Sequence, residues 1–215
     1  LEAHVAKKGY LEGRHMATVF NMLRANDLIW SFVVNNYLLG REPLPFDLLY
    51  WNADSTRMPA AMHSFYLRNM YLENRLVQPG GITLAGEVLD LRDIDLPIYQ
   101  LSTESDHIAP WKSTYALSQL VRGPYRFVLS GSGHIAGVIN PPAANKYYYL
   151  TNAKNPPSAD DWLAGAERRA GSWWPDWAAW VAQYGDGMVP AREPGARGAP
   201  IENAPGSYVA VKAAE

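Results

Sequence analysis

Residues 95–137, DLPIYQLSTESDHIAPWKSTYALSQLVRGPYRFVLSGSGHIAG, decide the fold. An apolar run follows Pro97 and ends in a polar loop, which is the pattern of a buried parallel strand. The stretch KSTYALSQLVRG then predicts a short helix, and PYRFVLSGSGHIAG predicts a second strand that ends in a glycine-rich loop. Strand, helix and strand in this order form a βαβ unit, so we expect an α/β fold with a mostly parallel sheet.

Sequence on the N-terminal side of this unit has a different character. Residues 1–77 are rich in aromatic side chains and are predicted to be helical. Apolar residues at helical spacing predict a first helix before Asn26, and the Asn26–Asp27 pair is expected to cap a second helix that ends at Gly40. A third helix is expected over about 60–76.

We therefore divide the chain into a helical cap over 1–77, an α/β core over 78–184 and a Gly/Pro-rich tail over 185–215. Within the core, GITLAGEVLDL alternates like a short hairpin, and residues 135–183 are expected to be helical. Four tryptophans there have the i, i+1, i+4, i+7 spacing of the buried face of a helix. They are Trp173, Trp174, Trp177 and Trp180.

Composition limits the possible functions. A chain of 215 residues forms one domain, or one domain with an elaborated insertion. Its 19 basic and 21 acidic residues give a net charge of −2, which removes the general electrostatic attraction to nucleic acid and to anionic membranes. The 48% of hydrophobic residues suffice for a packed core, and no apolar run approaches the ~20 residues of a membrane span. The absence of cysteine excludes disulfides and thiolate-bound metals.

Two side chains are placed for catalysis. Asp106 follows the first predicted strand and His134 follows the second, and catalytic groups of open α/β sheets lie at these carboxyl ends. This is the order of the acid and the base in the α/β-hydrolase triad, in which the carboxylate orients an imidazole that accepts a proton from the nucleophile. One aspartate and one histidine are weak evidence by themselves, and their placement strengthens it. No histidine or carboxylate cluster has metal-ligand spacing, so no metal is expected.

The nucleophile is missing from this pattern. A triad enzyme carries it in a Gly-x-(Ser/Cys)-x-Gly elbow, and the sequence contains no such elbow. Ser132 lies in the histidine loop and Ser172 precedes two tryptophans, so neither fits. We expect the nucleophile upstream of Leu1 and this chain to be the C-terminal part of an enzyme. A half-sheet with an exposed strand edge is then expected to be marginally stable and inactive alone.

Several longer stretches carry a family resemblance. The resemblance extends from about residue 20 to the end, and its most telling stretches are PFDLLYWNADSTRMP, DHIAPW, SGHIAGVINPP, WLAGAERRAGSWWPDWAAW and APGSYV. Together they resemble the C-terminal half of a polyhydroxyalkanoate synthase of the class I, short-chain-monomer type. The resemblance implies an α/β-hydrolase core with a helical cap that polymerises (R)-3-hydroxyacyl-CoA, such as 3-hydroxybutyryl-CoA, and releases CoA. It implies no metal or organic cofactor, because the thioester is already activated.

The resemblance also assigns residues. Asp106 matches the family's triad aspartate and His134 its general-base histidine, whereas the family's nucleophilic cysteine has no counterpart in this sequence. Arg24 matches an arginine near the CoA entrance, where a guanidinium suits a phosphate. Trp51 and Asp54 match a motif close to the triad. His107 is expected to lie beside the catalytic pair.

Partners follow from the same resemblance. They are the 3-hydroxyacyl-CoA substrate, the growing polyester, a second copy bound through the cap, and granule-associated proteins; nucleic acid is not among them. The expected location is the cytoplasm, at the surface of polyester granules.

Two other functions remain open. An esterase or depolymerase uses the same Asp–His pair and differs in its nucleophile and in the group that accepts the acyl chain. A non-catalytic granule-binding or dimerisation module needs neither residue. Activity of this chain without the upstream segment would contradict the expectation of a missing nucleophile.

Overall fold

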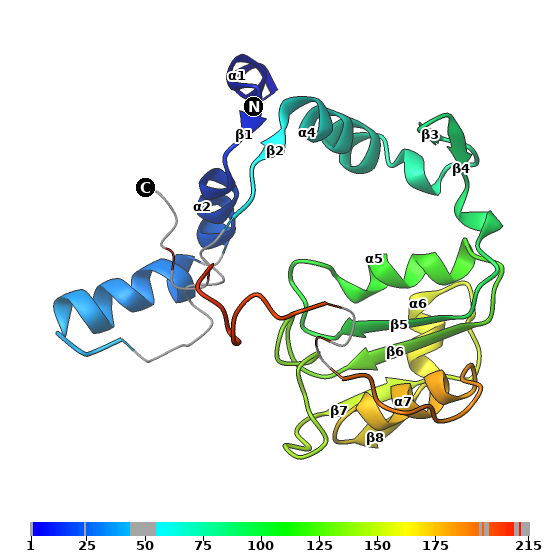
Figure 1. The fold of residues 1–215 in the computed structure, drawn as a ribbon. Coiled ribbons are helices and arrows are strands. Elements are labelled where there is room, and N and C mark those ends of the chain that lie inside the picture. The colour runs from blue at the N-terminus through cyan, green and yellow to red at the C-terminus, as the bar shows by residue number, and fades with distance from the viewer. Residues whose placement is uncertain are drawn as a thin grey trace. The chain divides into compact units, whose positions relative to one another are not determined.

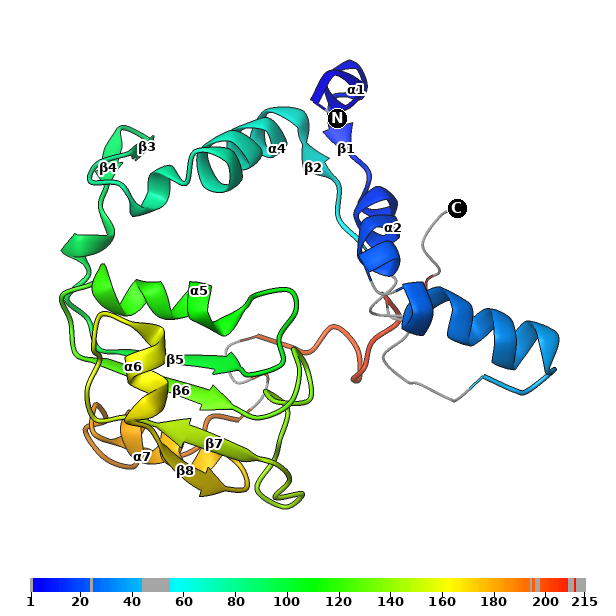
Figure 2. The same ribbon diagram turned by 180° about the vertical axis from the view of Figure 1, so that it is seen from behind.

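The computed structural model describes residues 2–23, 25–43, 55–193, 195, 198–208 and 211. The chain divides into two compact units, Leu1–Glu73 with Pro190–Glu215, and Asn74–Val189. Figures 1 and 2 show the elements of each unit from opposite sides. Among the described residues, we find no helix with the length and apolar character needed to cross a membrane.

The first unit is helical, as its sequence predicts. Its elements are α1 (Glu2–Lys8), β1 (Tyr10–Leu11), α2 (Gly13–Leu23), π-helical segments Asn26–Trp30 and Val33–Leu38, β2 (Met58–Pro59), α4 (Ala60–Tyr66) and a third π-helical segment, Leu67–Leu72. β1 and β2 form a short antiparallel pair.

One predicted helix end is confirmed and one predicted helix cap is wrong. Gly40 has a φ of 61°, a left-handed conformation that stops the second helix as expected. The predicted cap at Asn26 and Asp27 is wrong. The preceding residue, Ala25, is itself helical with a φ of −55°, and no side chain caps this turn. The π-helical segment Asn26–Trp30 therefore begins without a side-chain cap.

The second unit is built on a four-stranded sheet in the order β5-β6-β7-β8. The strands are β5 (Ile98–Thr103), β6 (Tyr125–Ser130), β7 (Tyr148–Thr151) and β8 (Glu167–Ala170). β5 and β6 are parallel, which confirms the predicted βαβ unit and the α/β class. β6–β7 and β7–β8 are antiparallel, so this sheet is partly rather than mostly parallel. The predicted hairpin is also present, as β3 (Ile82–Leu84) and β4 (Glu87–Leu89).

Helices pack on both faces of the four-stranded sheet (Figures 1 and 2). On one face, α5 (Trp111–Tyr115) and α6 (Ala159–Ala164) enclose the aromatic core of the unit. The core cluster is Trp111, Tyr115, Phe127, Leu129, Leu150 and Trp162. Phe127 and Trp162 are fully buried and meet edge to face with ring centroids 4.8 Å apart.

The region predicted to be helical also contains two strands, so that prediction is partly wrong. β7 is only four residues long, and β8 consists of Glu167, Arg168, Arg169 and Ala170, all exposed. Such a strand lacks alternating apolar residues because it lies at the edge of the sheet, where charged side chains discourage pairing with other chains.

α7 (Trp174–Ala182) covers the other face of the sheet, and its tryptophans do not form the predicted buried stripe. Trp174 and Trp177 are 37% and 44% exposed, and no residue of this helix is fully buried. The rings of Trp173 and Trp180 pack on Tyr99 of β5 instead. After α7, the described residues contain no α-helix or strand.

Candidate functional site

Asp106 lies just beyond the carboxyl end of β5. Backbone hydrogen bonds continue past the strand, from Glu104 to the carbonyl of Ser130 at 2.9 Å and from Ser105 to the carbonyl of Ser132 at 3.0 Å. The chain then turns, and Oδ1 of Asp106 accepts the backbone N–H groups of Ile108 and Ala109, both at 2.9 Å. These two bonds fix the carboxylate at the end of the sheet.

The surroundings of Asp106 keep it ionised. Burial alone raises its pKa, but the amide of Ala109, the imidazole of His134 and the amide of Ile108 all favour the charged form. Their combined effect is larger, and the pKa of Asp106 lies below its ordinary value of 3.8. At neutral pH the side chain is therefore a carboxylate, which accepts hydrogen bonds and donates none.

His134 lies beyond the carboxyl end of β6 and contacts this carboxylate. Its Nδ1 is 2.7 Å from Oδ2 of Asp106. Since the carboxylate only accepts, Nδ1 carries a proton, and in the neutral form of the imidazole Nε2 keeps a lone pair. The side chain of His134 is 45% exposed, whereas that of Asp106 is 9% exposed. Asp106 thus orients the imidazole, and the rest of the ring is exposed, as a general base requires.

The turn after His134 is closely packed. The N–H of Gly137 donates to Gly133 at 3.0 Å, and the hydroxyl of Ser130 donates to the carbonyl of Gly137 at 2.8 Å. A Cβ on Gly137 would lie 2.6 Å from the carbonyl oxygen of Gly131 and 2.6 Å from Cγ2 of Thr103. Glycine at 137 therefore lets the turn lie against the end of the sheet.

The remaining predicted site residues are not brought into this pair. His107 is exposed, and its side chain forms no hydrogen bond or ion pair with any described residue. Arg24, Trp51 and Asp54 lie outside the described residues. No group of three or more His, Asp or Glu side chains suited to a metal ion occurs in the described part of the chain.

Comparison with known proteins places the chain in a family. A model described as alpha/beta hydrolase fold matches residues 1–141. The chain belongs to the alpha/beta hydrolase fold family. Asp106 and His134 both lie within the matched residues.

The chain is also similar to two polymerases of known name. It is 57% identical over 213 residues to the "Poly(3-hydroxyalkanoate) polymerase subunit PhaC" of Rhizobium meliloti (strain 1021), covering 99% of this chain and 35% of the relative. It is 50% identical over 205 residues to the protein of the same name from Cupriavidus necator, covering 94% of this chain and 35% of the relative. The resemblance to polyhydroxyalkanoate synthases is confirmed, and the chain spans about a third of the length of these relatives.

The side chains that hold the histidine turn of this α/β-hydrolase chain from outside are not among the predicted site residues. The indole N–H groups of Trp173 and Trp174 both donate to the carbonyl of Val138, each at 3.1 Å. The hydroxyl of Ser172 donates to the carbonyl of Asn140. No periodic signal in the sequence predicts hydrogen bonds of this kind to single carbonyl groups.

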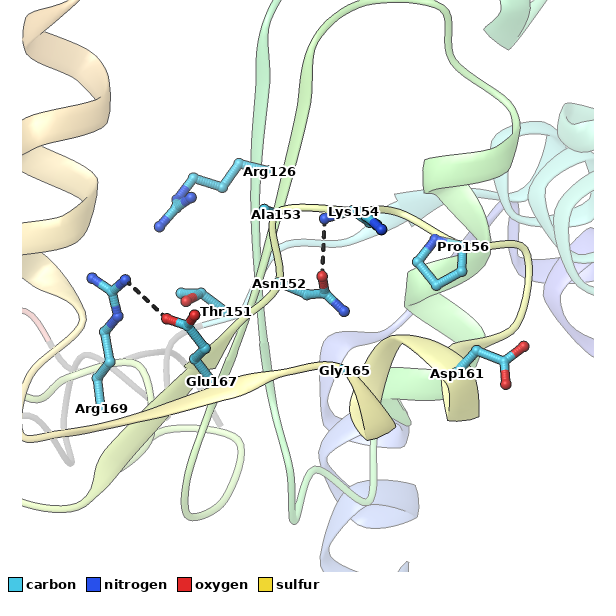
Figure 3. Close-up of a pocket in the computed structure, with 10 residues that line it drawn as sticks. All are labelled: Arg126, Thr151, Asn152, Ala153, Lys154, Pro156, Asp161, Gly165, Glu167 and Arg169. Atoms are coloured by element: carbon cyan, nitrogen blue, oxygen red, sulfur yellow. Dashed lines mark hydrogen bonds and ion pairs between the residues drawn. The ribbon is translucent and has the colours of Figure 1, made fainter.

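A cavity of about 560 Å³ lies at the other end of the sheet, and Figure 3 shows its lining. Arg126, the second residue of β6, lines it together with residues of β7, α6 and β8. Its charges are largely matched, since Arg126 pairs with Asp176 and Arg169 lies 3.5 Å from Glu167. The cavity is separate from the Asp106–His134 pair, because His134 follows the opposite end of β6.

Proposed function

We propose that this chain supplies the acid–base half of a polyhydroxyalkanoate synthase active site. The observation that carries the proposal is the 2.7 Å contact between Nδ1 of His134 and Asp106 at the ends of two parallel strands. Similarity of 99% of the chain to a poly(3-hydroxyalkanoate) polymerase supports the choice of reaction. The substrate is a (R)-3-hydroxyacyl-CoA, with 3-hydroxybutyryl-CoA as the representative short-chain monomer.

His134 acts first on the nucleophile. Nε2 takes the proton of a cysteine thiol, and the thiolate attacks the carbonyl carbon of the acyl-CoA thioester. The bond from that carbon to the CoA sulfur breaks, and the imidazolium returns its proton to the departing CoA thiolate. Asp106 holds Nδ1–H throughout and stabilises the imidazolium while it exists.

Chain extension uses the same base. Nε2 accepts the proton of the 3-hydroxyl of one acyl group as that oxygen attacks the thioester carbonyl of another, which forms an ester and frees the thiol. The reaction needs no metal or organic cofactor for this transfer, because CoA is already a good leaving group.

The cysteine comes from a segment outside this sequence, which contains no Cys and no Gly-x-Ser-x-Gly elbow. This chain alone is then inactive. We further assign Arg24 to the CoA phosphates, and Trp51, Asp54 and His107 to the surroundings of the substrate.

The first unit serves as the cap and as the contact with a second copy. Large apolar side chains of its helices are more than half exposed, which favours a protein partner. They include Met22, Leu23, Trp30, Phe32, Tyr37 and Leu38. The assembled enzyme works in the cytoplasm at the surface of the polyester granule, together with granule-associated proteins. Sedimentation velocity would measure whether two copies associate.

Release of CoA from 3-hydroxybutyryl-CoA tests the proposal. It is measured for this chain alone and for the extended protein, meaning this sequence preceded by the segment that carries the cysteine. We expect CoA release together with insoluble polyester from the extended protein and neither from the chain alone. Free 3-hydroxybutyrate in place of polyester would instead indicate a hydrolase. Folded extended protein that releases no CoA would favour a binding module.

A further inference from the structure

Three consecutive side chains reach the histidine turn from another part of the second unit. Ser172 and Trp173 lie between β8 and α7, Trp174 is the first residue of α7, and the three are here called the SWW clamp. Both indole N–H groups donate to the carbonyl oxygen of Val138 at 3.1 Å, and the Ser172 hydroxyl donates to the carbonyl of Asn140. The same carbonyl oxygen also accepts the backbone N–H of Asn140 at 3.1 Å, so Val138 is held both by the clamp and by its own turn.

The accepting carbonyls belong to the turn that carries His134. Val138 and Ile139 donate their N–H groups to the carbonyl of Ile135, at 3.1 and 2.9 Å. Asn140 is 1% exposed, and its side-chain amide pairs with the backbone N–H and carbonyl of Lys146. The turn is therefore one hydrogen-bonded unit, and a displacement of Val138 displaces the backbone that begins at His134.

The clamp is itself fixed to the sheet. Asp176, two residues after Trp174, accepts the Arg126 guanidinium and, at 3.0 Å, the hydroxyl of Tyr99. The ring of Trp173 packs on Tyr99, with centroids 6.2 Å apart. The clamp is thus a rigid support for a turn whose histidine is itself exposed.

Burial does not explain both tryptophans. Trp174 is 37% exposed, so a large part of its ring contributes little to the core. Trp177, one turn later in α7, is 44% exposed, and no described residue accepts a hydrogen bond from its indole. The polar end of Trp174 is what distinguishes the two residues, which makes Trp177 a matched control.

We propose that the SWW clamp positions the general base. Its three hydrogen bonds keep the turn in the place where Nδ1 of His134 meets Asp106, so these are positioning residues rather than catalytic ones. The proposal rests on the proposed function for the role of His134, but the geometry it predicts can be measured without any turnover.

The first test is kinetic and uses the extended protein. Trp173→Phe/Trp174→Phe removes both N–H groups and keeps two aromatic rings. We expect kcat for CoA release to fall roughly 10- to 100-fold with KM changed less than about threefold, because a misplaced base slows chemistry more than binding. Trp177→Phe is expected to keep the kcat of the parent protein. Trp174→Phe alone, where the ring is already partly exposed, is expected to lose about fivefold, the value of one neutral hydrogen bond.

The second test needs no activity and uses this chain. Nitrogen-15 shifts of the histidine rings, read through couplings to the carbon-bound ring protons, report which nitrogen carries the proton. The chain has five histidines, and His134→Ala identifies the signal. We expect the Nδ1–H form in the parent chain and in Trp177→Phe, and a shift toward Nε2–H in the double variant and in Trp174→Phe.

The results separate the two ideas. A tautomer change in the tryptophan variants together with an inactive extended protein would support the clamp and reject the proposed function. An unchanged tautomer and unchanged kcat in Trp174→Phe and the double variant would overturn the clamp. Absence of the Nδ1–H form from the parent chain would overturn it as well. If the double variant does not fold, Trp174→Phe alone decides.

Discussion

Asp106 and Asp176 are two aspartates associated with opposite ends of the same sheet, and their side chains are equally exposed, at 9%. Asp176 faces Arg126 and Tyr99, near the amino end of β6. An arginine stays protonated at any ordinary pH, so this pair cannot pass a proton on and fastens α7 to the sheet. Asp106 faces an imidazole that is 45% exposed, which can take and return a proton. The partner, and not the burial, separates the carboxylate proposed to orient a base from the one that anchors a helix.

The largest effect is expected at Asp106. Asp106→Asn keeps the shape of the side chain but presents an amide that can donate to Nδ1, so it favours the wrong tautomer of His134. We expect kcat of the extended protein to fall by about 10³–10⁴-fold. Circular dichroism should show an unchanged fold. A fall of less than tenfold in folded protein would mean that Asp106 does not orient the base.

Asp176→Asn should act on stability. It removes the negative charge that faces Arg126, and Arg126 is 29% exposed, so water compensates part of the loss. We expect the free energy of unfolding to fall by roughly 2–3 kcal/mol in a urea titration. An unchanged midpoint would show that this ion pair does not hold α7 to the sheet.

A pair of glycine variants tests the packing of the turn that carries His134. Gly137→Ala places a Cβ 2.6 Å from two atoms of the sheet end, and we expect it to cost about 1–3 kcal/mol in unfolding experiments. Gly133→Ala meets nothing closer than the Ser105 carbonyl oxygen at 3.9 Å and should stay within about 0.5 kcal/mol. Equal losses in the two variants would contradict the packing described for the turn.

The smallest effect is expected on the pH dependence of the free energy of unfolding in acid. Folding lowers the pKa of Asp106 below 3.8, so the stabilisation from this carboxylate is present above its ordinary pKa and is lost as the pH falls through the folded value. The stability difference between the parent chain and Asp106→Asn should therefore narrow as the pH falls below about 3.8. A difference that grows in acid would reverse the assigned direction of the shift.

The βαβ unit could be predicted because β5 and β6 are runs rich in apolar residues with turn residues on either side. Their order along the chain also predicted that Asp106 and His134 follow neighbouring strand ends. β8 could not be predicted, since an exposed edge strand of Glu and Arg has no hydrophobic period. The predicted buried stripe of tryptophans was wrong for a related reason. The side of α7 that faces the sheet includes Asp176 beside Trp173 and Trp180. Hydrogen bonds to single carbonyls, such as those to Val138, leave no periodic trace.

The most direct measurement is the rate of CoA release by the extended protein with His134→Ala, compared with Asp176→Asn at a temperature where both are folded. We expect His134→Ala to lose about 10²–10⁴-fold in kcat and Asp176→Asn to lose no more than a few-fold. If His134→Ala kept its activity, or if Asp176→Asn lost as much, the proton would not be handled at the end of the sheet where His134 meets Asp106.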